Sequence, residues 1–337
     1  MKKIISSLII TILMLSSFIG CGNTTKTKNN ESVDSSNNEL IIGITQWPGS
    51  YIWYGTEGLG YFEKEGINAK IKMFDNYSDG MNALAGGNID AYVLSYSDAI
   101  APFNSGADFK VVMVEDYSAG SDGLVATPDI KSIKDLKGKQ VATEIGSVDQ
   151  MFLYRCLSDA GMIPKDIDLI NMDIASAGNA FIAGKVDAAA IWDPSLTQAV
   201  DNGGNLLTTT ADYPGLIPAC LTVNGETLKN RGNDIKKVIK AWYSSLEGYE
   251  KNKEEFEKLV SEAADISVED FQMLMKGVHL LTLEENVEAF KDSGKDTSLI
   301  TCGKNEADFL LSVNMIDKVP DDFGQLLDKT YIEELAK

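Results

Sequence analysis

The 337-residue sequence predicts an α/β fold with two lobes, because one short pattern occurs twice in the chain. Residues 83–98 (ALAGGNIDAYVLSYSD) and 180–194 (AFIAGKVDAAAIWDP) each contain a helical tail that ends at glycine, an acid after a β-branched residue, and a short apolar run. The apolar runs are too short for helices and lack polar alternation, which is typical of buried strands in a parallel sheet. We therefore expect two sheets whose strand ends face each other, although small α/β units also recur by chance.

The residues that follow the two buried strands are the first candidates for a ligand site. Open α/β sheets bind ligands at the carboxyl ends of their strands, which places Ser95 and Tyr96 in one copy, and Trp192 and Asp193 in the other, at such an edge. Asp193 also precedes Pro194, an arrangement common at helix starts, so it either faces the ligand or caps a helix.

The first 38 residues predict a lipoprotein signal peptide and a tether. Residues 1–20 hold a charged start and an apolar run too short to span a membrane comfortably, and the junction at Cys21 resembles a bacterial lipobox, with Phe18 in place of the usual leucine. Residues 21–38 are polar and predict a flexible linker. We expect acylation of Cys21 and a folded body on the extracytoplasmic face of the cell membrane, and an uncleaved anchor helix would give the same location.

Composition excludes several classes of function. The formal net charge is −20, which argues against nucleic-acid binding because phosphate contacts need basic patches. Cys156, Cys220 and Cys302 lack the spacing of a zinc site or a disulfide framework, so buried thiols are expected, with a single bridge as the alternative. The sole histidine, His279, lies in an apolar context and is expected to be packed. No catalytic motif is present, so we expect a protein that is not an enzyme and needs no metal or cofactor.

From residue 39 onward, strands and helices alternate. Past residue 216 the pattern changes to amphipathic helices, with one apolar face that includes Ile235, Ile239 and Trp242. The other predicted strands are 40–45, 67–74, 109–114, 124–126, 140–143 and 167–172, and the predicted helices of the middle region are 147–157 and 176–183.

Further site candidates follow these other strands. A tryptophan is more often a packing residue than a ligand contact, but Trp47 stands beside Pro-Gly in a loop. Ser147 opens a helix, where free backbone N–H groups can bind a ligand, although it can equally be a plain N-cap. These candidates are Trp47, Trp53, Asp75, Asp122, Glu144 and Ser147.

The order of several short motifs resembles one family, the substrate-binding proteins of ABC importers of the nitrate, sulfonate, taurine and thiamine-pyrimidine type. The motifs are GYFEKEG (60–66), the 83–90 unit, DLKGK (135–139), Gly146-Ser147, and GKVDA (184–188) with WDP (192–194).

The resemblance implies a type II periplasmic-binding-protein fold, in which each lobe is a mixed sheet flanked by helices and a hinged cleft lies between the lobes. Lobe 1 would comprise residues 39–124 and 220–337, and lobe 2 residues 125–219. It also implies a monomer that delivers a small molecule to a permease and its ATPase.

The loops at the predicted cleft hold carboxylates and aromatic rings but no arginine or lysine. Such groups bind cations, so a cationic or zwitterionic, guanidinium-like nitrogen compound is the expected ligand. The segments 116–123 and 192–194 also resemble the branch of the family associated with urea-carboxylase-type nitrogen metabolism. The carboxylates are Asp75, Asp79, Asp98, Asp122, Glu144 and Asp193.

Two alternatives remain open at this point. The protein could be a receptor for nitrate, a sulfonate or taurine held by helix N-termini near Ser147, or one for a thiamine-pyrimidine precursor. From a different class, the same fold could serve as a ligand-sensing or pyrimidine-synthesis domain.

Overall fold

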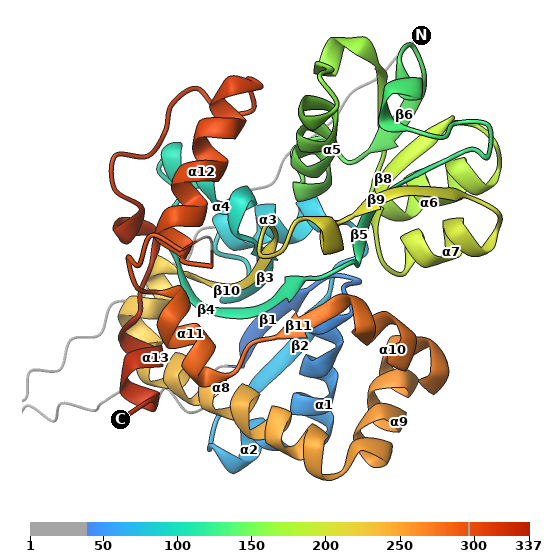
Figure 1. Ribbon diagram of the computed structural model, residues 1–337. Coiled ribbons are helices and arrows are strands. Elements are labelled where there is room, and N and C mark those ends of the chain that lie inside the picture. Colours follow the sequence, from blue (N-terminus) through green and yellow to red (C-terminus); the bar gives the residue numbers. More distant parts are fainter. Residues whose placement is uncertain (1–38, 296) are drawn as a thin grey trace, which may run out of the picture. The chain divides into compact units, whose positions relative to one another are not determined.

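The computed structural model describes residues 39–295 and 297–337. The predicted signal peptide, the tether and Cys21 lie outside the described residues. Two β-sheets flanked by helices make up the described chain, as predicted (Figure 1). None of the helices in this part is both long and apolar enough to cross a membrane.

The first sheet has six strands in the order β11-β4-β10-β3-β1-β2. β3 is buried along its whole length, as its apolar run predicted. It pairs in parallel with β1 but antiparallel with β10, so the sheet is mixed, as the family resemblance implies, although the apolar run alone is also typical of a parallel sheet. The strands are β1 (Leu40–Ile44), β2 (Ala69–Met73), β3 (Ala91–Ser95), β4 (Phe109–Ser118), β10 (Pro218–Asn224) and β11 (Val278–Leu280).

The second sheet has five strands in the order β7-β6-β8-β5-β9. Its central strand, β8, is fully buried. It runs parallel to β6 and antiparallel to β5. The two stretches singled out in the sequence therefore supply a central strand to each sheet. The strands are β5 (Asp122–Ala126), β6 (Gln140–Thr143), β7 (Asp168–Asn171), β8 (Ala188–Trp192) and β9 (Asn205–Thr209).

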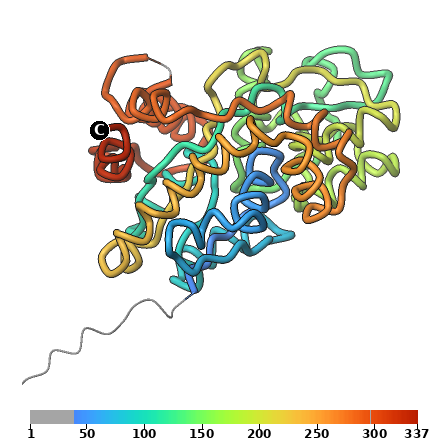
Figure 2. Tube along the Cα trace, turned by 90° about the horizontal axis from the view of Figure 1, so that it is seen from below, coloured from blue at the N-terminus to red at the C-terminus, as the bar shows by residue number. Residues whose placement is uncertain are grey.

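We call each sheet with its helices a lobe, lobe 1 being the six-stranded sheet. The helices after β10 return to lobe 1, where α8 and α9 pack against α1 (Figures 1 and 2). Lobe 1 holds α1 (Ile52–Gly58), α2 (Tyr61–Lys64), α3 (Tyr77–Ala85), α4 (Tyr96–Asn104), α8 (Gly225–Lys251), α9 (Lys253–Ala264), α10 (Val268–Leu274), α11 (Leu283–Ala289), α12 (Leu299–Ser312) and α13 (Thr330–Leu335). Lobe 2 holds α5 (Val148–Asp159), α6 (Ile174–Ile182) and α7 (Ser195–Asp201).

The predicted apolar face of α8 is the face that enters the core. Ile235, Ile239 and Trp242 are fully buried, and the Trp242 ring lies 4.5 Å from that of Trp53. The packing of α8 fits the interpretation of this region as scaffold. β10 and β11 were not predicted, however, and Ile217 and Ala219 at the start of β10 line the cavity described below.

The chain crosses between the two sheets at residues 119–121 and 210–217. The predicted border after residue 124 falls inside β5, since Asp122 already pairs with Trp192 in the second sheet. The return to the first sheet comes at Pro218, two residues before the predicted border.

Thr210 ties the two crossing segments together. Its fully buried hydroxyl lies 2.6 Å from Ser118 Oγ and accepts a hydrogen bond of 2.9 Å from the Gly120 amide. The Asp122 amide in turn donates to Ser118 Oγ. Because both crossings share this small network, it fixes where the first residues of β5 lie.

The thiols of Cys156 and Cys220 are free and buried, as expected, and Cys302 is buried with its Sγ 3.1 Å from Glu306 Oε1. The prediction of a packed histidine is wrong. The His279 side chain is 55% exposed, with Nε2 2.9 Å from Glu285 Oε1. The reason is that β11 is an edge strand, so alternate side chains face away from the core.

Candidate ligand-binding site

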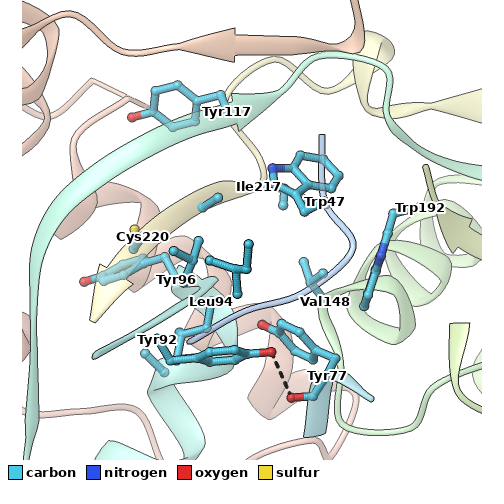
Figure 3. Close-up of a cluster of buried hydrophobic side chains, with 14 of the residues drawn as sticks. Trp47, Tyr77, Tyr92, Leu94, Tyr96, Tyr117, Val148, Trp192, Ile217 and Cys220 are labelled. Atoms are coloured by element: carbon cyan, nitrogen blue, oxygen red, sulfur yellow. Dashed lines mark hydrogen bonds between the residues drawn. The ribbon is translucent and has the colours of Figure 1, made fainter. Parts of the chain in front are cut away.

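A small cavity lies where strands of both sheets end. Thr45 directly follows β1, Ser95 ends β3 and Trp192 ends β8, which is the edge at which the sequence placed the site. Figure 3 shows Trp47, Tyr77, Val148 and Trp192 around a shared space. The lining residues are Thr45, Trp47, Ser50, Tyr77, Val93, Leu94, Ser95, Asp122, Val148, Trp192, Ile217 and Ala219.

The cavity has a volume of about 40 Å³. That is room for roughly one water molecule, so an organic ligand can enter only when the lining side chains or the lobes move. A larger hollow of about 900 Å³ lies against α11 and β11, but none of the predicted site residues lines it.

Trp47 lines the cavity and is held by a buried carboxylate. Its indole Nε1 donates to Asp116, at 3.2 Å from Oδ1 and 3.0 Å from Oδ2. A Cβ at Gly49 would lie 2.0 Å from Asp116 Oδ2, so glycine is needed for this close approach. Trp53 belongs instead to the core of lobe 1, where its Nε1 donates to Glu115 Oε2 at 3.0 Å.

On the lobe 1 side, a hydrogen-bond chain arranges the end of β3. The Ser95 amide donates to the Tyr77 hydroxyl at 3.0 Å, and this hydroxyl donates to Asp98 Oδ2 at 2.7 Å. Tyr96 does not line the cavity, because its fully buried ring packs toward Gly303 of α12. Asp75 is exposed and lies outside the lining.

On the lobe 2 side, the N-terminus of α5 meets a carboxylate from lobe 1. The Val148 amide donates to Asp98 Oδ2 at 3.1 Å, which is a favourable place for an anion. Ser147 occupies the N-cap position, but its hydroxyl donates to Glu144 O rather than capping the helix. Glu144 accepts hydrogen bonds from the amide and hydroxyl of Ser78 in lobe 1.

Trp192 and Asp193 take different roles after β8. Trp192 lines the cavity, contacts the Tyr77 ring edge-on at 5.4 Å between centroids, and donates from Nε1 to Gln46 O at 3.1 Å. Asp193 Oδ1 accepts hydrogen bonds from the Thr197 amide at 2.9 Å and hydroxyl at 2.8 Å. Asp193 therefore caps the first turn of α7 and is not among the residues that line the cavity.

The cavity region concentrates buried acids. Burial raises the pKa of Asp98 and Asp122 to about 7 each, and that of Asp116 to about 8. Burial also raises the pKa of Asp149 well above its usual value. No lysine, arginine or histidine is among the lining residues, and the described residues contain no cluster of three or more acids, cysteines or histidines arranged to hold a metal.

Sequence reasoning missed Tyr77, Asp116 and Asp149. Asp116 lies beyond the predicted end of its strand at residue 114, whereas the structure places it in the buried end of β4. Asp149 lies in the first turn of the helix that Ser147 opens, so a search of that turn for acids would have found it.

Comparison with known proteins assigns the family. The model of the NMT1/THI5-like family matches residues 47–290, which is well over half of the chain. The chain belongs to this family. The resemblance to binding proteins of the nitrate, sulfonate and taurine type is thereby confirmed.

Several relatives of this NMT1/THI5-like chain are binding proteins. A putative aliphatic sulfonates-binding protein of Bacillus subtilis is 25% identical over 99% of this chain and 97% of its own length. The taurine-binding periplasmic protein of Escherichia coli is 26% identical over 44% of this chain and 46% of its own length. The crystal structure of the periplasmic aliphatic sulphonate-binding protein of Escherichia coli aligns with a TM-score of 0.70 at 22% identity, covering 87% of this chain and 92% of that one, which shows the shared fold.

Proposed function

We propose that this chain is the solute receptor of an ABC importer, and that it captures a small organic sulfonate or aminosulfonate. The observation that carries the proposal is a cavity lined by residues of both lobes at the carboxyl ends of their strands. A ligand bound there touches both lobes only when they are closed, so binding favours the closed state that a permease could recognise.

The names of the relatives support a sulfonate rather than the guanidinium-like cation preferred from the sequence. Hydroxyl donors on the cavity wall fit this class. The hydroxyls of Ser50, Thr45 and Ser95 line the cavity. Their present partners are Glu115, Phe74 O and the Ser97 hydroxyl, and a ligand would compete with these for the hydrogen bonds. Sulfonate oxygens accept hydrogen bonds, so they can use these hydroxyls without an arginine.

A cationic nitrogen compound is the second candidate. The specific observation in its favour is Asp122, a carboxylate on the cavity wall with Asp116 and Asp149 nearby and no basic residue among the lining. Carboxylates beside the rings of Trp47 and Trp192 are chemistry that binds cations.

A thermal-shift screen separates the two candidates. A ligand at a hundred times its Kd stabilises the native state by about 2.7 kcal/mol, which is readily measured. We expect ethanesulfonate or taurine to raise the melting temperature, with nitrate and guanidinium as comparison solutes. If guanidinium-like solutes raise it and sulfonates do not, the second candidate replaces the first. If none of these solutes does so, both ligand classes fail.

We also propose that the receptor acts as a monomer held at the extracytoplasmic face of the membrane by acylation of Cys21. Mass spectrometry of the membrane fraction should find a lipid-modified N-terminal cysteine, and Cys21→Ala should release the protein from that fraction. A wild-type chain that is released without modification would contradict this anchor.

A further inference from the structure

Two buried acids, one on the cavity wall and one in the helix next to it, have carboxyl oxygens without the donors that buried carboxylates normally have. Asp122 begins β5 and lines the cavity, and it is 1% exposed. Asp149 lies in the first turn of α5 and is fully buried. Neither oxygen of Asp149, nor Oδ2 of Asp122, has a hydrogen-bonding partner among the N–H and O–H groups of the described residues. Buried carboxylates without donors are costly when ionised.

The two carboxyl groups contact each other. A hydrogen bond joins Asp122 and Asp149, and it lowers the pKa of Asp122 while raising that of Asp149. Ionised carboxylates are acceptors only, so this bond can form only when one of the two carries a proton. Two adjacent buried carboxyls do not both ionise near neutral pH, and the proton belongs to the pair rather than to either residue.

Acids surround the pair, and no lysine, arginine or histidine shifts the pKa of either carboxyl. The partial positive charge at the N-terminus of α5 acts in the opposite direction on Asp149, which lies in the first turn of this helix. Asp98 and Glu144 face Asp149, and both raise its pKa. Asp193 raises the pKa of Asp122, which in turn faces Asp116. The Cys156 thiol on α5 and two hydroxyls also lie beside the pair. The Ser118 hydroxyl hydrogen-bonds to the Asp122 carboxyl and lowers its pKa, and the Thr210 hydroxyl donates to Asp122 O at 3.4 Å.

We propose that Asp122 and Asp149 share one proton and form a proton-exchange subsite on the wall of the ligand cavity. The role in ligand binding rests on the function proposed above, whereas the shared proton does not. An ammonium group that docks on the pair donates hydrogen bonds to both carboxylates, and the shared proton passes to solvent. One positive charge enters and one leaves, so the charge of the subsite does not change.

The subsite therefore distinguishes two kinds of sulfonate. An aminosulfonate releases a proton when it binds, so its affinity rises up to tenfold per pH unit while the pair is protonated. An alkanesulfonate brings no cation, and it leaves the pair protonated. The pair thus selects for an amino group and couples that selection to the external pH.

The first experiment needs no ligand. Urea unfolding between pH 5.5 and 8.5 is compared for the wild type, Asp149→Asn, Asp122→Asn and the exposed control Asp201→Asn. The wild type releases the shared proton on unfolding, whereas an asparagine amide supplies the hydrogen bond without a titrating proton. For either pair variant, we expect the slope of the unfolding free energy against pH to correspond to the release of about one proton fewer than in the wild type. The slope of the control should match that of the wild type. If this slope is unchanged in both pair variants, Asp122 and Asp149 do not share a proton.

A measurement on the wild type covers the case in which neither variant folds. Carbon-13 NMR of labelled aspartate should show a carboxyl that is still protonated at pH 7 while exposed aspartates are ionised. A carboxyl that is protonated at pH 7 does not by itself identify the pair, because the pKa of Asp98 and of Asp116 is also raised, to about 7 and about 8. The pair is identified by two carboxyl signals that shift together over two separate steps, and independent single-step titrations overturn it.

The second experiment tests the exchange with taurine and ethanesulfonate as probes. Calorimetry at pH 7 in phosphate and in Tris, which differ in ionisation enthalpy, gives the number of protons released. We expect about one for taurine and none for ethanesulfonate, with the release lost in Asp149→Asn. Taurine binding without proton release overturns the exchange. If neither probe binds, the sulfonate proposal fails, and the unfolding slope still decides whether the shared proton exists.

Discussion

Asp193 has a structural role that can be separated from its charge. Its Oδ1 accepts two hydrogen bonds from Thr197 in the first turn of α7. Asparagine retains this acceptor, so the free energy of unfolding of Asp193→Asn, measured in urea, should lie within about 0.5 kcal/mol of that of the wild type. Asp193→Ala loses the acceptor and should cost about 1 kcal/mol. If the two variants are equally destabilised, the charge rather than the cap stabilises α7.

At the level of single residues, the sequence predicted the correct edge of each sheet for the site. It did not predict which side chains at that edge face the cavity. Trp47, Ser95, Asp122 and Trp192 line it as a site at strand ends requires. Tyr96 follows Ser95 directly and points elsewhere, because it lies in the first turn of α4 and packs on α12. Such directions depend on tertiary packing, which a motif without coordinates does not contain.

At the scale of elements, the crossing between the sheets depends on one hydroxyl. Thr210 is fully buried and its Oγ1 contacts both Ser118 and Gly120. Thr210→Val keeps the shape but leaves the Gly120 amide without its acceptor, which should cost about 1–3 kcal/mol in urea unfolding. The exposed Thr330→Val is the matched control and should change stability by less than about 0.5 kcal/mol. A Thr210→Val protein as stable as the control would show that the crossing needs no such bond.

The sequence pattern predicted best those strands whose residues share one environment along most of their length. β6 was predicted at its observed bounds, and β3 and β8 lie inside the two stretches singled out in the sequence, because each is a short run with a clear beginning. β4 continues four residues beyond its predicted end, through Glu115 and Asp116, where the indoles of Trp53 and Trp47 donate hydrogen bonds to these buried acids. No local propensity marks two acids as strand interior when their partners lie more than sixty residues away in the sequence.

Across the whole molecule, the fold and the acidity have different origins. The two sheets follow from repeated units of helix, turn and buried strand, which is why the sequence predicted the architecture. The buried carboxyls come from four separate elements, with Asp98 on α4, Asp116 on β4, Asp122 on β5 and Asp149 on α5. Their convergence follows from the topology, so the sequence indicated an acidic site that includes Asp98 and Asp122 but did not indicate Asp116 or Asp149.

This convergence gives the stability of the protein a definite pH dependence. Burial raises the pKa of Asp98 and Asp122 to about 7, and that of Asp116 and Glu306 to about 8. In the unfolded chain the same groups ionise near pH 4. Folding therefore retains protons that unfolding releases, and the contribution to stability is complete below about pH 4 and lost as the pH rises through about 8.

We expect the free energy of unfolding to fall between pH 5 and 9, by up to about 1.4 kcal/mol per pH unit for each proton released. Surface carboxylates such as Asp135 and Asp166, whose pKa is lowered by hydrogen bonds, act in the opposite direction only at more acidic pH. Urea unfolding at each pH measures the trend, and repetition in 0.5 M NaCl is the control, since salt screens repulsion between surface charges but not the desolvation of buried ones. A slope that vanishes in salt would assign the trend to the surface charge, and stability that rises toward pH 9 would mean that these carboxyls are ionised in the folded protein.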